Sequence, residues 1–341
     1  LNTTPESYEL HQAFAQMVEA GCEYAVMEVS SQGIKMHRTD GLYFNYAIFT
    51  NISPDHIGPG EHADFEEYLY YKTRLLNMCG IGLVNKDDEH APQIIKAANC
   101  ELYTYSEESK EADFVATDIR YVSQPDFVGT EFHISGKYDM EVRLGIPGLF
   151  NVVNALAAVS VCSFLGLDQA RISHALENIR VNGRMEIVYT SERCTVLVDY
   201  AHNAVSMESL LSTLRDYKPK RLVCVFGCGG NRSKDRRYSM GEIGGKMADL
   251  SIITADNSRY EKVEDIIADI RGSIEKTGGK FIEIPDRREA IRYSILHAQP
   301  GDMVAVIGKG HEDYQEINGV RHHFLDREVI EETVKELGEK A

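Results

Sequence analysis

Strand-like and helix-like segments alternate along almost the whole chain, and this alternation is typical of the α/β class. Short apolar runs suited to buried strands are separated by longer stretches with helical periodicity. The runs fall into two series, which meet near residues 183–186. We therefore predict two domains, residues 1–185 and residues 186–341, with mostly parallel sheets and with the second domain of the Rossmann-like type.

The first series begins with a predicted helix. Thr4 is a typical N-cap residue and Pro5 suits the first helical position, so we expect a helix from there to residue 20. In the second series, Asp286 with Glu289 is typical of a capping box at a helix start. The other predicted helices are 65–76 and 148–165, and the predicted strands are 24–29, 46–50, 81–85, 195–199, 221–226, 251–254, 280–284 and 303–307, with a β-rich stretch at 101–146.

Charge and composition exclude several classes of function. The formal net charge of −17 argues against general binding to nucleic acid or to an anionic membrane, which needs a basic surface. No apolar run is long enough for a transmembrane helix, and the first residues lack the basic and apolar regions of a signal peptide. The seven cysteines are scattered without a C-x-x-C pair, which indicates reduced thiols rather than a zinc site. We therefore expect a cytoplasmic protein.

Polar residues follow nearly every predicted strand. In open α/β sheets, ligands bind beyond the carboxyl ends of the strands, so these residues are the candidates for chemistry. Neither glycine-rich segment is a nucleotide fingerprint, because Arg232 stands where G-x-G-x-x-G needs glycine and residues 308–310 lack the spacing of a Walker loop. Taken alone, each candidate could be a surface or capping residue, so their order along the chain carries the information. The segments are 28–31, 50–56, 70–74, 199–202, 227–232, 256–259 and 308–313.

Together and in this order, the motifs resemble the Mur ligase family, in particular its members that add the third amino acid of the peptidoglycan stem peptide. The resemblance covers essentially the whole chain. It implies a central ATPase domain with a mostly parallel sheet, a C-terminal Rossmann-like domain, and an acid–amino-acid ligase that cleaves ATP to ADP and phosphate. The motifs are Asn2-Thr3-Thr4-Pro5-Glu6, Met27-Glu28-Val29-Ser30-Ser31, Thr50-Asn51 with Asp55-His56, Tyr71-Lys72 with Arg74-Leu75, Phe150-Asn151 with Asn154-Ala155, Gly183-Arg184-Met185-Glu186, Asp199-Tyr200-Ala201-His202, and segments 226–232, 256–259 and 308–315.

The resemblance also implies a mechanism. ATP would phosphorylate the terminal carboxylate of a UDP-N-acetylmuramoyl dipeptide, and the amine of the added amino acid would attack the acyl phosphate. Phosphoryl transfer of this kind depends on positioning and charge neutralisation. The resemblance places Glu28, His56 and Lys72 at Mg²⁺, with Lys72 carbamylated. A carbamate supplies the anionic oxygen that a magnesium site can use, whereas an ammonium would repel the ion.

The remaining roles carry over from the family by position. The UDP-muramoyl peptide would be held by Asn2, Thr3, Thr4, Ser30 and Arg38. The adenine side, the phosphates and the ribose of ATP would be reached by Asn151, Arg184 and Asp199, respectively. The added amino acid would be bound by Arg232, Asp256, Asn257, Ser258, Arg259, Gly308 and Glu312.

Arg259 decides which amino acid we expect. A guanidinium pairs bidentately with a carboxylate. The diaminopimelate-adding members of the family carry Asp-Asn-Pro-Arg at this point, whereas the lysine-adding members usually lack the arginine. This chain keeps Arg259 and has Ser258 in place of the proline. We therefore expect meso-diaminopimelate to be added to the D-glutamate carboxylate of UDP-N-acetylmuramoyl-L-alanyl-D-glutamate, with L-lysine as the alternative.

Two further alternatives stay open at this point. A folylpolyglutamate synthase has the same type of second domain, although Arg232, Arg259 and Glu312 argue against it. A non-catalytic binding protein derived from a ligase is the other, because the sequence has no G-x-x-G-K-[ST] phosphate loop. The sequence also begins without Met. The resemblance implies that the N-terminal uridine-binding domain and the first strand and phosphate loop of the ATPase domain are missing from it, and we expect a monomer that does not turn over ATP by itself.

Overall fold

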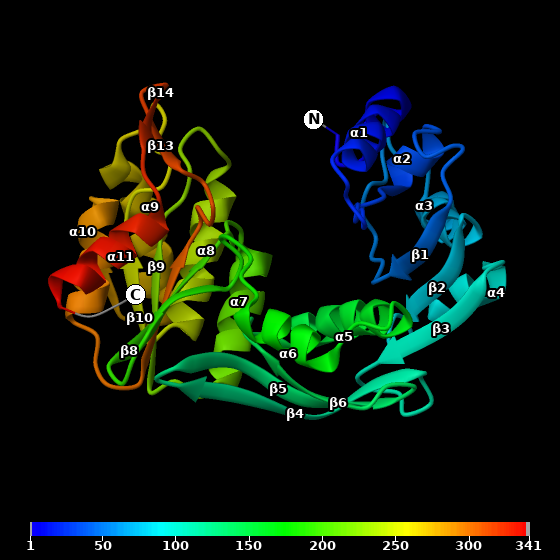
Figure 1. The fold of residues 1–341 in the computed structure, drawn as a ribbon. Helices are drawn as coiled ribbons and strands as arrows, with labels where there is room; N and C mark the ends of the chain where they lie inside the picture. The colour runs from blue at the N-terminus through cyan, green and yellow to red at the C-terminus, as the bar shows by residue number, and fades with distance from the viewer. Residues whose placement is uncertain (1, 339–341) are drawn as a thin grey trace. The chain divides into compact units, whose positions relative to one another are not determined.

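The computed structural model describes residues 2–338, and their helices and strands follow an α/β order (Figure 1). The α/β fold class predicted from the sequence is confirmed. The contacts between residues divide the chain into two compact units. Unit 1 consists of residues 1–117, 133–140 and 153–172, and unit 2 consists of residues 118–132, 141–152 and 173–341. The chain passes between the units more than once, and the predicted boundary between residues 185 and 186 stays a prediction.

Unit 1 is built around parallel strands. Strands β1, β2 and β3 pair in parallel in this order. Helices α3 and α4 cover them, and Phe49, Leu69, Val84 and Ile94 meet in one apolar core. The elements are α1 (Ser7–Glu19), α2 (Ser31–Lys35), β1 (Phe44–Phe49), α3 (Phe65–Arg74), the 3-10 turn η1 (Leu75–Asn77), β2 (Cys79–Asn85), α4 (Ala91–Ala97) and β3 (Glu101–Ser106).

The first helix begins later than predicted. Helix α1 starts at Ser7 with Glu6 as its N-cap, and the side chain of Glu6 makes no capping hydrogen bond. Thr4 does not cap the helix, because its fully buried hydroxyl is engaged elsewhere. Its Oγ1 donates to the carbonyl of Glu28 at 3.1 Å and accepts from the amide of Ser30 at 2.9 Å. Tertiary hydrogen bonds therefore override the local capping signal at this position.

The predicted strand at 24–29 is wrong. This segment belongs to no helix or strand, and the side chains of Tyr24 and Val26 are 59% and 97% exposed. A strand exists only through hydrogen bonds to a neighbouring strand. No strand between residues 2 and 338 pairs with this segment. Its apolar composition alone therefore did not make it a strand.

The predicted β-rich stretch is confirmed, and the sheet of β1–β3 continues through it in the order β1-β2-β3-β4-β5-β6. Two helices follow it, and the first of them is the predicted helix 148–165 shortened by one residue at each end. The elements are β4 (Phe114–Gln124), β5 (Phe127–Gly136), β6 (Met140–Leu144), α5 (Leu149–Phe164) and α6 (Gln169–Asn178).

Unit 2 contains a second six-stranded sheet in the order β11-β10-β9-β12-β8-β7. Its pairs are parallel except for β7 with β8, which is antiparallel. All five strands predicted in this part of the chain are confirmed, with ends that shift by no more than a residue. The elements are β7 (Glu186–Thr190), β8 (Cys194–Asp199), α7 (Ala204–Asp216), β9 (Arg221–Phe226), α8 (Lys234–Met247), β10 (Leu250–Ile253), α9 (Val263–Thr277), β11 (Phe281–Glu283), α10 (Arg287–Leu296), β12 (Asp302–Ile307), β13 (Tyr314–Ile317), β14 (Val320–His323) and α11 (Asp326–Glu336).

Helices cover both faces of this second sheet. Successive side chains of a strand point to opposite faces, so a central strand contributes to two cores. In β12, Met303 and Ala305 pack with α7, α8 and α9, whereas Val304 and Val306 pack with α10 and α11. The strand is buried along its whole length, which explains why its sequence is a continuous apolar run. Between residues 2 and 338, no helix is both long and apolar enough to cross a membrane.

Helix caps hold the loops beside this sheet. The side chain of Asp286 accepts a hydrogen bond from the amide of Glu289 at 3.0 Å, so the predicted cap of α10 is confirmed. Helix α7 begins with a complete capping box between Asn203 and Ser206. Both helix starts lie next to loops that carry candidate functional residues, and the caps limit how far those loops can move.

Candidate functional site

Three loops with candidate residues lie next to one another at one edge of the second sheet. They follow the carboxyl ends of β9, β10 and β12, which are neighbouring parallel strands. The loop of residues 227–232 follows β9, the loop of residues 254–260 follows β10, and residues 308–313 follow β12. This is the edge where open α/β sheets bind ligands, and it is the edge that the sequence predicted.

A buried lysine connects two of these loops. The side chain of Lys309 is fully buried, and its Nζ donates to Asn257 Oδ1 and to Glu312 Oε2, both at 3.2 Å. Asn257 Nδ2 donates to the same Glu312 oxygen at 3.0 Å. The amide of Glu316 donates to Asn257 Oδ1 at 2.9 Å, which assigns the orientation of the Asn257 amide. Asn257 and Glu312 are therefore held in place before any ligand binds.

Asp256 and Gly308 face each other across the same two loops. Asp256 is buried, and a side chain at Gly308 would place its Cβ only 2.8 Å from Asp256 Oδ2. Gly308 has a φ of +111°, a conformation that glycine adopts readily. Its amide donates to the carbonyl of Asp199 at 3.1 Å, which connects the loop to the end of β8. A larger residue at position 308 would displace the Asp256 carboxylate.

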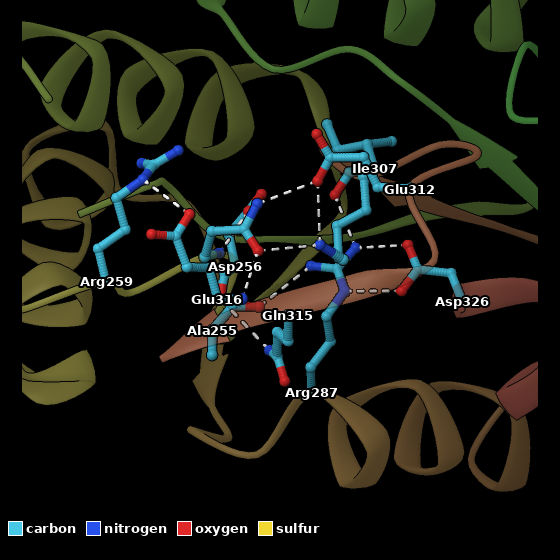
Figure 2. Close-up of polar contacts among 11 residues, drawn as sticks. Ala255, Asp256, Arg259, Arg287, Ile307, Glu312, Gln315, Glu316 and Asp326 are labelled. Carbon is cyan, nitrogen blue, oxygen red and sulfur yellow. Dashed lines mark hydrogen bonds and ion pairs between the residues drawn. The ribbon is translucent and has the colours of Figure 1, made fainter. Parts of the chain in front are cut away.

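A buried ion pair that the sequence did not reveal stabilises the loops after β10 and β12. Arg287 and Asp326 are both fully buried and pair through two hydrogen bonds of 2.7 Å (Figure 2). The guanidinium also donates to the carbonyl of Ala255 at 3.2 Å and to that of Ile307 at 3.0 Å. Burial disfavours the charged guanidinium, but the Asp326 carboxylate outweighs it, and the pKa of Arg287 lies above its ordinary value. Arg287 thus fixes the residues immediately before Asp256 and Gly308.

Arg259 is held at an unusual backbone conformation beside this cluster. Its φ is +50°, which is uncommon for a residue with a side chain. Its amide donates to the carbonyl of Glu316 at 3.0 Å, and its carbonyl accepts from the amide of Asn318 at 2.6 Å. Its Nη1 donates to the carbonyl of Gly230 at 2.8 Å, and its Nε lies 3.4 Å from Glu316 Oε2. The guanidinium is therefore placed by both neighbouring loops, and it keeps unused donors.

The loop after β9 is tied to the loop after β10. The amide of Gly230 donates to the carbonyl of Asn257 at 2.8 Å. The buried Arg237 donates to both oxygens of Glu261 at 2.8 Å, and Glu261 accepts in turn from the amide of Asn231. Ser258 is buried where its carbonyl approaches Gly230. Arg232 lies on the exposed side of this loop, and no hydrogen bond or ion pair between residues 2 and 338 involves its side chain.

The three predicted ATP residues also lie in unit 2. Asp199 is buried at the end of β8, and burial raises the pKa of its carboxyl group, although the amides of Met185 and Ala201 each donate to it at 2.8 Å. Arg184 is exposed, with its guanidinium 5.0 Å from the ring centre of Tyr200. Asn151 donates from Nδ2 to the carbonyl of Pro147 at 2.7 Å, at the start of α5.

The residues predicted to hold the UDP-muramoyl peptide meet in unit 1. Arg38 pairs with Glu6 at 2.8 Å and donates to the carbonyl of Thr4 at 3.3 Å. Asn2 Nδ2 donates to the same Glu6 carboxylate at 3.2 Å. The Ser30 hydroxyl lies 3.2 Å from that of Thr4 and caps α2 by accepting from the amide of Gly33 at 3.0 Å. Four of the five predicted residues are thus brought together, whereas Thr3 is exposed beside them.

In unit 1, two of the residues predicted to bind the metal ion, Lys72 and His56, lie near the same ring, that of Tyr68. Burial lowers the pKa of Lys72, against the opposing charges of Glu28, Asp88 and Asp55. No carboxylate between residues 2 and 338 lies within ion-pair distance of its Nζ, which instead lies 5.3 Å from the ring centre of Tyr68. The ring of His56 lies 5.8 Å from the same Tyr68 ring. His56 is exposed and has a φ of +53°.

These residues fit a magnesium ion only with an added anionic ligand. Among the residues that the structure describes, no group of three or more His, Cys, Asp and Glu side chains could hold a metal ion. Mg²⁺ keeps several water ligands and takes few protein carboxylates, so Glu28 and one further oxygen ligand at Lys72 would suit it. Lys72 is half-buried, and the negative charges of three carboxylates act on it, although none of the three pairs with it. The additional oxygen ligand would therefore have to be supplied at Lys72.

Sequence reasoning missed Lys309, Arg287 and Glu316. Lys309 stands inside the Gly-Lys-Gly run that the sequence singles out, and a lysine between two glycines was the available signal. Arg287 carries no local signal, because an arginine at the start of a helix is ordinarily a surface residue. Glu316 lies in a short strand whose alternation does not reveal its neighbour Arg259.

Comparisons with known proteins agree with the arrangement of motifs. The family model "Mur ligase middle domain" matches residues 1–162, and the model "Mur ligase, glutamate ligase domain" matches residues 183–310. A UDP-N-acetylmuramoyl-L-alanyl-D-glutamate--2,6-diaminopimelate ligase from Caldanaerobacter subterraneus subsp. tengcongensis is 39% identical over 98% of this chain and 68% of its own length. A second ligase of that name, from Clostridium acetobutylicum, is 40% identical over 97% of this chain and 67% of its own length.

The fold agrees with a solved structure as well. A structure described as UDP-N-acetylmuramoyl-L-alanyl-D-glutamate--2,6-diaminopimelate ligase superposes with a TM-score of 0.79 and 33% identity. The match covers 99% of this chain and 70% of that one. The chain therefore spans about two thirds of the length of these relatives, and the matches cover nearly all of this chain.

Proposed function

The chain belongs to the Mur ligase family, and from this premise we propose that it adds meso-diaminopimelate to the D-glutamate carboxylate of UDP-N-acetylmuramoyl-L-alanyl-D-glutamate in peptidoglycan synthesis, with cleavage of ATP to ADP and phosphate. The relatives and the solved structure carry names with this substrate and this amino acid. The observation that supports the amino acid best is the cluster of Asp256, Asn257, Glu312 and Arg259 at the carboxyl edge of the second sheet.

This cluster suits an amino acid with charged groups at both ends. Glu312 accepts two hydrogen bonds at one oxygen, so its other oxygen is available to an ammonium group. Lys309 orients the Glu312 carboxylate by its charge and by a hydrogen bond. Among residues 2–338, no neighbour accepts from Nη2 of Arg259, and a guanidinium with free donors binds a carboxylate tightly. The cluster would hold the incoming amino acid while its nucleophilic amine stays free.

In unit 1, Glu28, His56 and a carbamylated Lys72 would hold Mg²⁺. The ion would neutralise charge on the phosphoryl group that is transferred. The protein's own contribution is to keep the Lys72 amine half-buried near the Tyr68 ring, with no carboxylate of residues 2–338 at ion-pair distance. A neutral amine in that position can add CO₂ to form an N–C bond, with release of one amine proton to water. Asn2, Thr3, Thr4, Ser30 and Arg38 would hold the acceptor, and Asn151, Arg184 and Asp199 would contact ATP.

An assay of the full-length gene product tests the proposal directly. ADP release would be measured with UDP-N-acetylmuramoyl-L-alanyl-D-glutamate as acceptor and with meso-diaminopimelate, L-lysine or L-glutamate as the added amino acid. We expect diaminopimelate to support the fastest turnover. Turnover with glutamate alone, on a folate acceptor, would instead identify a folylpolyglutamate synthase. If no amino acid supports ADP release although both substrates bind, the non-catalytic alternative holds.

Replacement of Arg259 tests the choice of amino acid. We expect Arg259→Ala in the full-length gene product to lower kcat/KM for meso-diaminopimelate by roughly 30-fold or more, because loss of one partner of a buried charge pair costs about 2–5 kcal/mol. L-lysine has no distal carboxylate, so its kcat/KM should change much less. Arg271→Ala, which removes a half-exposed guanidinium from α9, is the matched control and should change neither value. Equal losses for both amino acids would remove the reason for naming diaminopimelate.

A further inference from the structure

His62 is a fully buried histidine to which the proposed function gives no role. Its Nε2 lies 2.8 Å from the hydroxyl of the buried Ser31, so one of the two groups donates a hydrogen bond to the other. The other ring nitrogen, Nδ1, makes no hydrogen bond among residues 2–338. It lies 3.7 Å from Glu67 Oε2, which is too far for one. Within the described part of the chain, the ring of His62 is therefore hydrogen-bonded to Ser31 alone.

Ser31 is the first residue of α2, and this helix carries part of the predicted acceptor site. Ser30 caps α2 and its amide is bonded to Thr4, and Arg38 follows the helix. Helix α2 has only five residues, and a helix this short depends on tertiary contacts to keep its place. The hydrogen bond between Ser31 and His62 is therefore one of the contacts that determine where the acceptor residues lie.

The other end of α2 is bound by an ion pair. Lys35 Nζ donates to Glu67 Oε2 at 2.8 Å and to the carbonyl of Glu61 at 2.9 Å. Glu67 belongs to the first turn of α3, so this pair also joins α2 to α3. The side chains of Lys35 and Glu67 are 25% and 29% exposed, and water competes with a pair of this kind. The hydrogen bond between Ser31 and His62, in contrast, is shielded from water.

The backbone and the ring of His62 connect α2 to the predicted metal residues. The amide of His62 donates to the carbonyl of His56 at 3.0 Å, and its carbonyl accepts from the amide of Gly58 at 3.0 Å, which closes a tight loop between the two histidines. The ring centre of His62 lies 5.2 Å from that of Tyr68, the ring that Lys72 Nζ approaches to 5.3 Å. His62 thus contacts both the helix of the acceptor residues and the surroundings of the metal residues.

From these contacts we propose that His62 is a positioning residue for the acceptor. Through Ser31 it holds α2, and with it Ser30 and Arg38, in the arrangement that binds the UDP-muramoyl peptide. The inference rests on the proposed function, because it concerns the acceptor of the same ligase. Loss of the hydrogen bond lowers the fraction of molecules with α2 in this arrangement, and the apparent affinity falls with that fraction. The residues that would bind the added amino acid belong to unit 2, so affinity for the amino acid should not change.

Two substitutions of His62 in the full-length gene product test this role. A Gln side chain can place its amide where Nε2 stands and can donate or accept there, whereas Asn reaches only as far as Nδ1. We expect His62→Asn to raise the dissociation constant of UDP-N-acetylmuramoyl-L-alanyl-D-glutamate by about tenfold, because it leaves the buried Ser31 hydroxyl unpaired. His62→Gln should restore most of the affinity. Isothermal titration calorimetry without ATP and magnesium measures the constant, and KM for meso-diaminopimelate should stay unchanged.

Ser31→Ala tests the same pair from its other side, also if His62→Asn does not fold. It removes only the hydroxyl and should raise the dissociation constant of the acceptor as His62→Asn does. The double variant should lose no more than the larger of the two single losses, because both changes remove one interaction. His11→Asn replaces an exposed histidine of α1 and is the matched control, which should bind the acceptor as the unsubstituted protein does.

Three results would overturn the inference alone. Unchanged acceptor affinity in Ser31→Ala and His62→Asn would show that the pair does not position α2. Equal weakening by His62→Asn and His62→Gln would show that the contact with Ser31 is not what the histidine supplies. A rise in KM for meso-diaminopimelate as large as that for the acceptor would show a general loss of structure. If the unsubstituted gene product binds no UDP-muramoyl dipeptide, the proposed function fails and the inference with it, so the two failures are distinguishable.

Discussion

Ligation is expected to fall by about 10²–10³-fold or more when Lys72 is replaced by alanine in the full-length gene product, because the loss of one group that stabilises developing charge costs about that much in kcat. The physical reason is that Lys72 is half-buried and pairs with no carboxylate among residues 2–338, and a carbamate there would complete a magnesium site with Glu28 and His56. Short carboxylic acids such as formate or acetate should restore part of the activity, because they supply the missing oxygen ligand. ADP release with and without the added acid measures both effects.

Two further variants separate the carbamate from the charge of the lysine. Lys72→Arg keeps a positive charge but cannot form a stable carbamate, so it should be as inactive as Lys72→Ala. Lys96→Ala removes an exposed lysine from α4 and should behave as the unsubstituted protein. A carbamate resonance from isotopically labelled bicarbonate should disappear in Lys72→Ala. Activity retained by Lys72→Arg would show that the site does not use a carbamate.

The second large effect concerns stability. We expect Arg287→Ala to lower the free energy of unfolding by about 3–5 kcal/mol, because the fully buried Asp326 would lose its counter-charge. The carbonyls of Ala255 and Ile307 would also lose a donor, so the loops with Asp256 and Gly308 should become less ordered. Urea unfolding followed by circular dichroism measures the loss.

The next residue in the chain provides the matched control for this variant. Arg288 pairs with Glu332 on the surface, where the two side chains are 47% and 56% exposed. Exposed ion pairs contribute about 0–1 kcal/mol, so Arg288→Ala should change the stability little. The double variant Arg287→Met with Asp326→Leu should recover part of the loss, since it leaves no buried charge. Similar losses for Arg287→Ala and Arg288→Ala would contradict the role given to the buried pair.

Much of the fold could be predicted because the strands of the second sheet are buried on both faces. A strand such as β12 must then be a continuous apolar run, and such a run is visible in the sequence. The two wrong predictions, the N-cap at Thr4 and the strand at 24–29, concern segments whose structure depends on tertiary contacts. Thr4 carries a capping signal, but its hydroxyl bonds to Glu28 and Ser30. Val26 belongs to an apolar run, but no strand between residues 2 and 338 pairs with it.

The candidate site, too, could be predicted only in part. Residues 256–259 and 308–312 follow parallel strands, so their meeting at one edge of the sheet followed from the strand pattern. The sequence could not reveal that Lys309 and Arg287 are fully buried, because burial of a charge depends on partners far away in the chain. Asn257 is 52 residues from Lys309, and Asp326 is 39 residues from Arg287.

The sequence by itself determined the α/β class, the strands of the second sheet and the order of motifs that assigns the chain to its family, because apolar runs and motif residues are local properties of the chain. The tertiary structure alone decided which charges are paired. It joined Arg287 to Asp326 and Arg259 to Glu316, since such pairs form between loops and helices that only the packed sheet brings together. An ion pair is short-ranged in space but not in sequence, and its energy depends on burial that the fold creates.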